Sequence, residues 1–218
     1  MKINEIINED EKFDQYDPHD LTKKNPNFEH AANADKVANL IETNCGQMLN
    51  AYRNSDEYLY RGIKHAMSPV IITNIRQDRI PGYLNPGLHN KTIEIFTKLG
   101  LKANRGNSIF CTTSKEIASA WGTYYIIFVK DGWSGTVFNK VKRSYVFNRI
   151  EGLNPKEKFD DYNTNFIKKL APVVVTPENL RIVLDQRFED VLITGQSYIA
   201  LEPEAAITTK ILKRLDIL

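Results

Sequence analysis

The sequence lacks most of the motifs from which a chemistry is usually inferred. It contains only two cysteines, Cys45 and Cys111, and they do not form a C-x-x-C pair. This excludes a disulfide scaffold and suggests a reducing compartment. The four histidines have no metal-ligand spacing with one another or with either cysteine, so no metal is expected. A P-loop, a G-x-G-x-x-G fingerprint and a G-x-S-x-G elbow are also missing.

Long apolar runs and an excess of one charge are also absent. No stretch approaches the roughly eighteen apolar residues that cross a membrane, and the first residues contain no apolar run of signal-peptide length. Lys and Arg number 29 and Asp and Glu number 27, which gives a formal net charge of +2. This balance argues against a nucleic-acid coat protein, and the scattered aromatic residues disfavour RNA recognition. We therefore expect a cytoplasmic protein without a membrane partner.

The 218 residues, of which 42% are hydrophobic, are enough for one good-sized domain. Short strands without regular strand–helix alternation predict an α+β fold, with helices mostly in the first half. We expect an N-terminal arm and helix over residues 1–56 and one compact unit over 57–218. Within the first part, residues 1–30 are predicted to be irregular and 31–52 helical.

Local patterns predict the remaining elements. Strands are expected over residues 58–60, 70–73, 108–112, 124–129, 173–175, 190–194 and 197–201. Residues 134–147 are expected to form a mixture of strand and loop. Helices are expected over residues 92–99, 115–121, 155–170 and 178–185, with 207–218 open between strand and helix. Ser114 and Thr176 are the predicted N-caps, and Gly195 and Gln196 are the predicted turn of a hairpin.

Arg61 is the most unusual residue of this pattern. It is expected at the tip of an apolar strand, where a buried guanidinium must find a negative partner. Its planar fork and permanent charge suit it to gripping a phosphate, although a salt bridge at a strand end is the plainer alternative. Gly62 would let a ligand or another backbone approach closely.

Three segments, in this order, carry polar residues on apolar strands. They contain Arg61 with Gly62, then Thr112, Thr113 and Ser114 after Phe110, and lastly Glu189 and Asp190 before an apolar run. Together they resemble the ADP-ribosyltransferase family, in the branch with an arginine, a Ser-Thr-Ser strand and a late acidic strand. The resemblance covers roughly residues 57–201. It implies a split antiparallel β-sandwich with NAD, as substrate and without a metal, in the cleft between the sheets.

The resemblance also implies roles for single residues. Arg61 would hold the NAD diphosphate, and Gly62, Thr113 and Ser114 would contribute to the nucleotide pocket. Thr112 replaces the serine that orients the catalytic acid in the family.

Asp190 stands at the family's catalytic glutamate, with Glu189 beside it. Because a strand alternates its faces, only one of the two can point into the cleft unless a β-bulge intervenes, and the sequence leaves open which one does. Phe188 takes the position of a second acid that arginine-modifying relatives carry, so the resemblance disfavours arginine as the acceptor. We separately expect a protein acceptor rather than a nucleic acid. Arg79 and Arg105 are further candidates for phosphate contact, with solvated surface charges as the alternative.

The expected function is that of a mono-ADP-ribosyltransferase, a glycosyltransferase that moves ADP-ribose from NAD to a macromolecular acceptor. Three alternatives stay open: an inactive binding or structural module of the same fold, an NAD glycohydrolase, and an unrelated α+β interaction protein. The small size suits a phage or bacterial effector or toxin, which would act in the host cytoplasm if it is phage-encoded.

Overall fold

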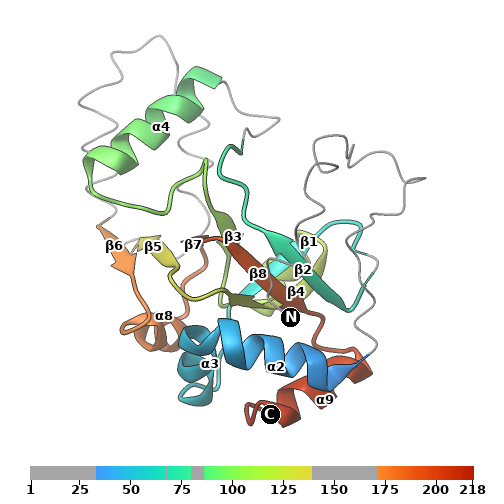
Figure 1. The fold of residues 1–218 in the computed structure, drawn as a ribbon. Helices are drawn as coiled ribbons and strands as arrows, with labels where there is room; N and C mark the ends of the chain where they lie inside the picture. The colour runs from blue at the N-terminus through green and yellow to red at the C-terminus, as the bar shows by residue number, and fades with distance from the viewer. Residues whose placement is uncertain (1–32, 67, 80–85, 139–170) are drawn as a thin grey trace.

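The computed structural model describes residues 33–66, 68–79, 86–138 and 171–218, which form eight strands and six helices in an α+β arrangement (Figure 1). The arm expected over residues 1–30 and the helix expected over 155–170 lie outside these ranges. Of the stretch over residues 134–147, only the first five residues are described, and they form a strand.

The first sheet has the strand order β1-β4-β8-β2 and is antiparallel throughout. Its strands are β1 (Tyr60–Ile63), β4 (Thr123–Val129), β8 (Ser197–Leu201) and β2 (Val70–Asn74). The central strands β4 and β8 are rich in β-branched and aromatic residues, and every residue of β8 is buried.

The second sheet has the order β3-β7-β5-β6 and is also antiparallel. It contains β3 (Ile109–Cys111), β7 (Val191–Thr194), β5 (Ser134–Phe138) and β6 (Pro172–Val175). The predicted α+β class is therefore confirmed, and two separate antiparallel sheets are consistent with a split sheet.

Among the described residues, one isolated β-bridge, between Tyr60 and Thr112, joins the two sheets. The Tyr60 amide donates to the Thr112 carbonyl at 2.7 Å, and the Thr112 amide donates back to the Tyr60 carbonyl at 2.9 Å. Beyond this bridge, β1 continues into the first sheet and β3 into the second. The bridge therefore marks the point where the two sheets separate.

The predicted hairpin of residues 190–201 is wrong. Strands β7 and β8 follow one another across Gly195 and Gln196 but pair in different sheets. Each strand has two edges for pairing: β3 and β5 occupy those of β7, and β4 and β2 occupy those of β8. The two-residue link therefore crosses from one sheet to the other.

The first predicted helix is divided into α2 (Ala34–Asn44) and α3 (Gly46–Arg53). Asp131 causes the break, because its carboxylate accepts the Gln47 amide at 2.9 Å while its own amide donates to the Asn44 carbonyl at 2.7 Å. The C-terminal segment forms the helix α9 (Ala206–Arg214), which packs against α2 (Figure 1).

Three further elements differ from expectation at their ends. Helix α4 (Pro86–Lys98) begins six residues before the predicted start at residue 92. Strand β1 begins at Tyr60, so Arg61 lies within the strand and not at its tip. Helix α8 (Leu180–Gln186) has Asn179 at its N-cap in place of the predicted Thr176. The Asn179 side chain instead accepts the Thr176 amide at 2.8 Å.

Ser114 is confirmed as the N-cap of α5 (Lys115–Ser119), since its hydroxyl accepts the Ile117 amide at 3.2 Å.

The core beside β1 is aromatic, with Tyr52 at its centre. The Tyr52 hydroxyl donates to the Ile127 carbonyl at 2.7 Å, and its ring makes edge contacts with Tyr58 and Phe128. Within the described ranges, no helix has both the length and the apolarity needed to cross a membrane.

Candidate functional site

Arg61 lies on β1 directly after the bridge that joins the sheets. Its Nε and Nη1 atoms are buried and make no hydrogen bond within the described ranges. The guanidinium carbon lies 5.9 Å from the centroid of the Tyr198 ring on β8, which offers a cation–π contact but no negative charge. Because a buried guanidinium without a hydrogen-bonded anion is costly, the site around Arg61 suits an anionic ligand.

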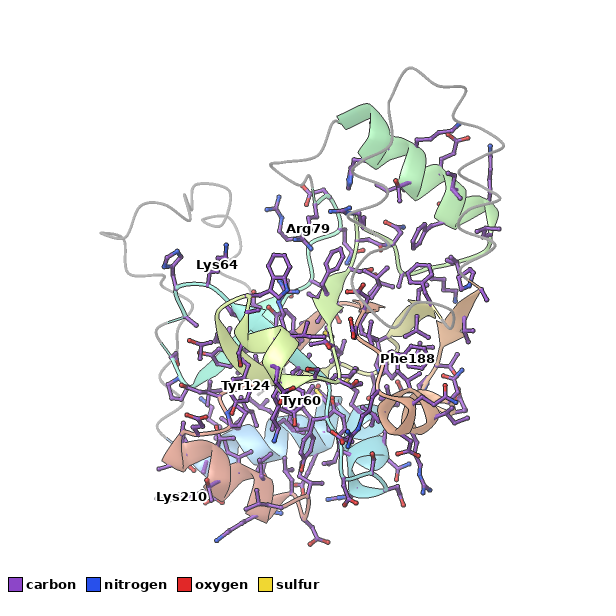
Figure 2. All side chains as sticks on the ribbon, turned by 180° about the vertical axis from the view of Figure 1, so that it is seen from behind. Tyr60, Lys64, Arg79, Tyr124, Phe188 and Lys210 are labelled. Atoms are coloured by element: carbon purple, nitrogen blue, oxygen red, sulfur yellow. The ribbon has the colours of Figure 1, made fainter. Side chains whose placement is uncertain are left out.

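Arg79 and Arg105 lie close to Arg61. Their guanidinium carbons are 4.6 Å and 5.9 Å from the ring centroid of Phe110 on β3. Burial, followed by the positive charges of Arg61 and Arg105, lowers the pKa of Arg79 to about 10. The structure therefore brings Arg61, Arg79 and Arg105 together, and we call these three residues the arginine cluster. In the view of Figure 2, Arg79 lies above Tyr60 and Tyr124, whereas Lys210 on α9 lies below them.

Asp190 directly precedes β7, the strand that pairs with β3. Its Oδ2 atom is buried and has no hydrogen-bond partner among the described residues. Burial, and to a smaller extent the neighbouring Glu189, raises the pKa of Asp190 to about 6, while the positive charge of Arg105 opposes this rise. Such a perturbed carboxyl group beside a cationic cluster is typical of a functional site. Of the two acidic candidates, Asp190 is therefore the one with a buried, unpartnered oxygen and a raised pKa among the described residues.

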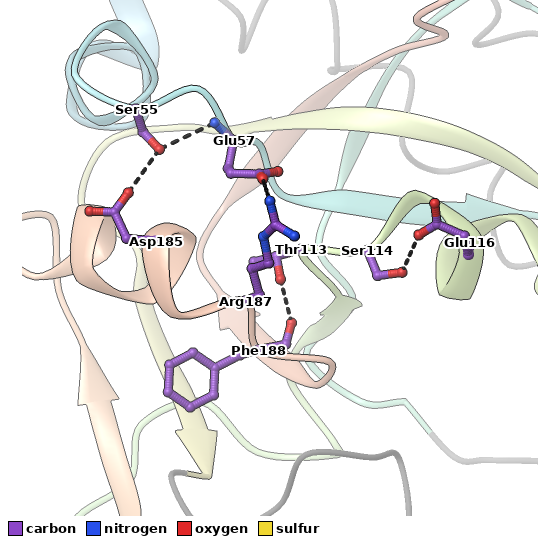
Figure 3. A network of polar contacts seen from close by, with 8 residues as sticks. All are labelled: Ser55, Glu57, Thr113, Ser114, Glu116, Asp185, Arg187 and Phe188. Carbon is purple, nitrogen blue, oxygen red and sulfur yellow. Dashed lines mark hydrogen bonds and ion pairs between the residues drawn. The ribbon is translucent and has the colours of Figure 1, made fainter.

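Thr112 and Thr113 contact different partners. The Thr112 hydroxyl accepts the Ser114 amide at 3.1 Å, and no hydrogen bond joins it to Asp190 in the described part of the chain. The Thr113 hydroxyl donates to the Phe188 carbonyl at 2.9 Å, and the Thr113 amide donates to the same oxygen at 3.0 Å (Figure 3). Thr113 therefore fixes the segment that leads to Asp190.

Ser114 is engaged in helix capping, because its hydroxyl also donates to the Glu116 carboxylate at 2.7 Å (Figure 3). Gly62 has a packing role. A Cβ at Gly62 would lie 2.1 Å from the Ala118 carbonyl oxygen and 2.7 Å from the Trp121 Cβ, so only glycine lets α5 approach β1 this closely.

A second set of contacts joins the residues before Glu189 and Asp190 to the residues that precede β1 (Figure 3). Arg187 ends α8 in the left-handed conformation, with φ of 56°, and its guanidinium pairs with Glu57 at 2.8 Å. On the other side of Glu57, the Ser55 hydroxyl accepts the Glu57 amide at 3.2 Å and contacts Asp185 at 3.3 Å. These contacts link the residues before β1 to those before β7.

Tyr198 and His89 belong to the site but were not predicted. Tyr198 is 7% exposed and faces Arg61, and His89 on α4 is 3% exposed and lies close to Arg79. Burial, followed by the charge of Arg105, lowers the pKa of His89. Neither residue belongs to a local motif, and no sequence signal could have identified them.

No group of three or more His, Cys, Asp or Glu side chains in the described ranges could hold a metal ion. Comparison of the chain with protein-family models, with curated proteins and with solved structures gave no match.

Proposed function

We propose that the protein is an NAD-dependent mono-ADP-ribosyltransferase. The observation that carries this proposal is the Arg61 guanidinium, whose buried Nε and Nη1 atoms have no hydrogen-bond partner within the described ranges. It lies in a cluster of three arginines where two sheets separate, with a perturbed carboxyl group nearby. A dinucleotide fits both parts of such a site, because its diphosphate can bind the arginines and its ribose can lie against the carboxylate.

In the proposed reaction, the arginine cluster binds the diphosphate of NAD and fixes the position of the attached ribose. The bond between the ribose C1 atom and the nicotinamide nitrogen breaks, and its electron pair leaves with neutral nicotinamide. The sugar carbon becomes positively charged, and the Asp190 carboxylate stabilises this charge more strongly than it does the ground state. The acceptor then forms a bond to the sugar carbon and releases one proton.

The acceptor is proposed to be a protein side chain other than arginine. The residue two positions before Asp190 is Phe188, which is half-buried and holds Thr113 through its carbonyl oxygen. An apolar ring at this position provides no carboxylate to bind an arginine substrate or to accept a proton from it.

An inactive NAD-binding module is the second candidate. It is favoured by one observation: the Thr112 hydroxyl is used by the Ser114 amide and not by Asp190. An acid that no hydroxyl orients is held less rigidly for catalysis. An NAD glycohydrolase would use the same residues with water as the acceptor, and the experiment below separates it from a transferase.

The test uses NAD labelled in the adenylate part, incubated with the protein and a cell lysate. Label on macromolecules supports the transferase, whereas free nicotinamide without label transfer supports the glycohydrolase. NAD binding without either product supports the inactive module. Arg61→Ala is expected to weaken NAD binding by about tenfold or more, since a charge-assisted contact contributes about 1.5–3 kcal/mol.

Arg76→Gln is the matched control for Arg61→Ala. Arg76 is exposed and forms an ion pair with Asp78 at 3.6 Å, so its loss should leave NAD binding unchanged. Absence of NAD binding by the wild-type protein would exclude the proposal, whatever the variants do.

A further inference from the structure

The position of the Asp190 carboxylate depends on the backbone that carries it. Its buried Oδ2 atom has no hydrogen-bond partner among the described residues, and the Thr112 hydroxyl accepts the Ser114 amide instead. An acid whose buried oxygen no neighbour holds takes its direction from the chain on either side. The chain after Asp190 is fixed by the pairing of β7 with β3, so the contacts of residues 187 and 188 fix the other side.

Thr113 holds the residue two positions before the acid with two hydrogen bonds. Its hydroxyl and its amide donate to the Phe188 carbonyl at 2.9 Å and 3.0 Å (Figure 3). Thr113 is 5% exposed, so these bonds lie in a low-dielectric interior, which strengthens them. The neighbouring Thr112 forms the bridge with Tyr60, which directly precedes Arg61.

The residue before Phe188 has a strained backbone and is held by an ion pair. Arg187 ends α8 in the left-handed conformation, with φ of 56°, which is unfavourable for a residue with a Cβ. Such a conformation persists where surrounding contacts hold it, and the Arg187 guanidinium pairs with Glu57 at 2.8 Å (Figure 3). Because the left-handed residue sets the direction in which the chain leaves α8, the ion pair acts on the path toward the acid.

These contacts close a ring, which we call the positioning ring. Its members, in the order of the contacts, are Glu57, Tyr60, Thr112, Thr113, Phe188 and Arg187. Arg61 directly follows one member, and Asp190 lies two residues after another. The ring therefore connects the two groups that the proposed reaction places on the diphosphate and on the ribose of NAD. In a closed ring, each contact limits the movement that the others leave free.

We propose that the positioning ring holds the Asp190 carboxylate at the distance from Arg61 that NAD requires. Its positioning residues are Thr113, Glu57 and Arg187. The role of this distance in catalysis rests on the proposed function, whereas the placement of the acid does not. The three residues touch neither NAD nor the acceptor and act only through the acid. Loss of one of their contacts should therefore slow nicotinamide release without weakening NAD binding.

An NMR titration of the Asp190 carboxyl carbon tests the placement without any ligand. Burial raises the pKa of Asp190 to about 6, so a loosened segment that admits water should lower this pKa toward 3.8. Arg187→Gln is the decisive variant, because removal of a positive charge can by itself only raise the pKa of a carboxyl group or leave it unchanged. Glu189 and Arg105, whose charges also act on Asp190, are the same in both proteins. A lower pKa supports the ring, and an unchanged or higher pKa overturns it.

Arg181→Gln is the matched control for Arg187→Gln. Arg181 lies on the same helix and forms an exposed ion pair with Asp185 at 3.7 Å, so its loss should leave the pKa of Asp190 unchanged. Thr113→Val, which removes the hydroxyl bond to the backbone, should lower this pKa, and Thr113→Ser should restore it. A folded Thr113→Val protein with the wild-type pKa at Asp190 would count against the ring.

Nicotinamide release measures the catalytic consequence, because it requires no identified acceptor. Glu57→Gln and Arg187→Gln should each lower kcat about tenfold, since a small displacement of a reacting group is enough to slow a reaction. Isothermal titration calorimetry should show an unchanged Kd for NAD, because the arginine cluster is intact. The double variant should be no slower than either single variant, since both remove the same ion pair. Effects that multiply, or a weaker Kd with an unchanged kcat, would overturn the ring.

The two experiments also separate the positioning ring from the proposed function. If the variants shift the pKa of Asp190 as expected but the wild-type protein neither binds NAD nor releases nicotinamide, the transferase is excluded and the ring is retained. If the wild-type protein releases nicotinamide and the variants change neither kcat nor the pKa of Asp190, the transferase is retained and the ring is excluded.

Discussion

Replacement of Asp190 by asparagine is expected to stabilise the folded protein at neutral pH. The Asp190 carboxyl group has a pKa of about 6 in the folded state, against 3.8 for an unperturbed group, mainly because it is buried. The folded protein therefore binds more protons than the unfolded chain between these two pH values. Its stability falls as the pH rises through this window, and above pH 6 the cost of the buried charge is fully present.

The size of the effect follows from the two pKa values. The difference, about 6 minus 3.8, is roughly two pKa units, and each unit corresponds to about 1.4 kcal/mol, which gives about 3 kcal/mol. Asparagine has nearly the same shape but cannot ionise. At pH 7.5 we therefore expect Asp190→Asn to raise the free energy of unfolding by about 1–3 kcal/mol, with no gain below pH 3.8, where the wild-type carboxyl is neutral in both states.

Urea denaturation of wild type and Asp190→Asn at several pH values between 3.5 and 7.5 measures this difference. The neighbouring Glu189→Gln serves as the comparison, because Glu189 contributes to the raised pKa and its removal should shift the transition window of Asp190 to lower pH. A destabilised Asp190→Asn variant, or a stability difference that does not change with pH, would refute the reasoning. Under the proposed function, the stabilised Asp190→Asn variant should also lose nicotinamide release, whereas Glu189→Gln should retain it.

Three further predictions concern the frame of the site. Thr113→Val should lower the free energy of unfolding by about 1 kcal/mol through loss of the hydroxyl bond to the Phe188 carbonyl, and Thr113→Ser should restore it in the same urea titration. Gly62→Ala should cost about 2–3 kcal/mol, because the new Cβ would lie 2.1 Å from the Ala118 carbonyl oxygen; an unchanged thermal midpoint would contradict this packing. Burial raises the pKa of Cys111 to about 12, so a thiol reagent at pH 8 should label it only after unfolding in guanidinium.

Strands were predictable where the local sequence is decisive. The strand expected over residues 124–129 is β4, Thr123–Val129, and that expected over residues 70–73 is β2, Val70–Asn74. Dense β-branched and aromatic runs carry this information within the strand itself. The division of the first helix was not predictable, because Asp131, which causes it, lies more than eighty residues away in the chain.

The false hairpin has a similar origin. Gly195 and Gln196 give the same local signal whether the flanking strands pair with each other or with other strands. The outcome depends on which strands fill the edges of β7 and β8, and these partners come from distant parts of the chain. A sequence pattern specifies that a chain turns, but not which edge the next strand will meet.

The candidate site was predictable in its members but not in its grouping. Arg61, Arg79 and Arg105 were all candidates for phosphate contact, yet only the fold shows that they share one cluster next to Phe110 and Tyr198. Strand alternation could not distinguish Glu189 from Asp190. The buried Oδ2 atom and the raised pKa of Asp190 depend on tertiary packing, which the order of residues does not show.

The two connections between the sheets have a kinetic consequence. The sheets are joined by the Tyr60–Thr112 bridge and by the two-residue link Gly195–Gln196 between β7 and β8. At Tyr60 and Thr112 the sheets cannot move apart without breaking the two backbone hydrogen bonds of the bridge. If an anionic ligand binds at the arginine cluster, we expect its association rate to fall as ionic strength rises, because salt screens the attraction of the three positive charges.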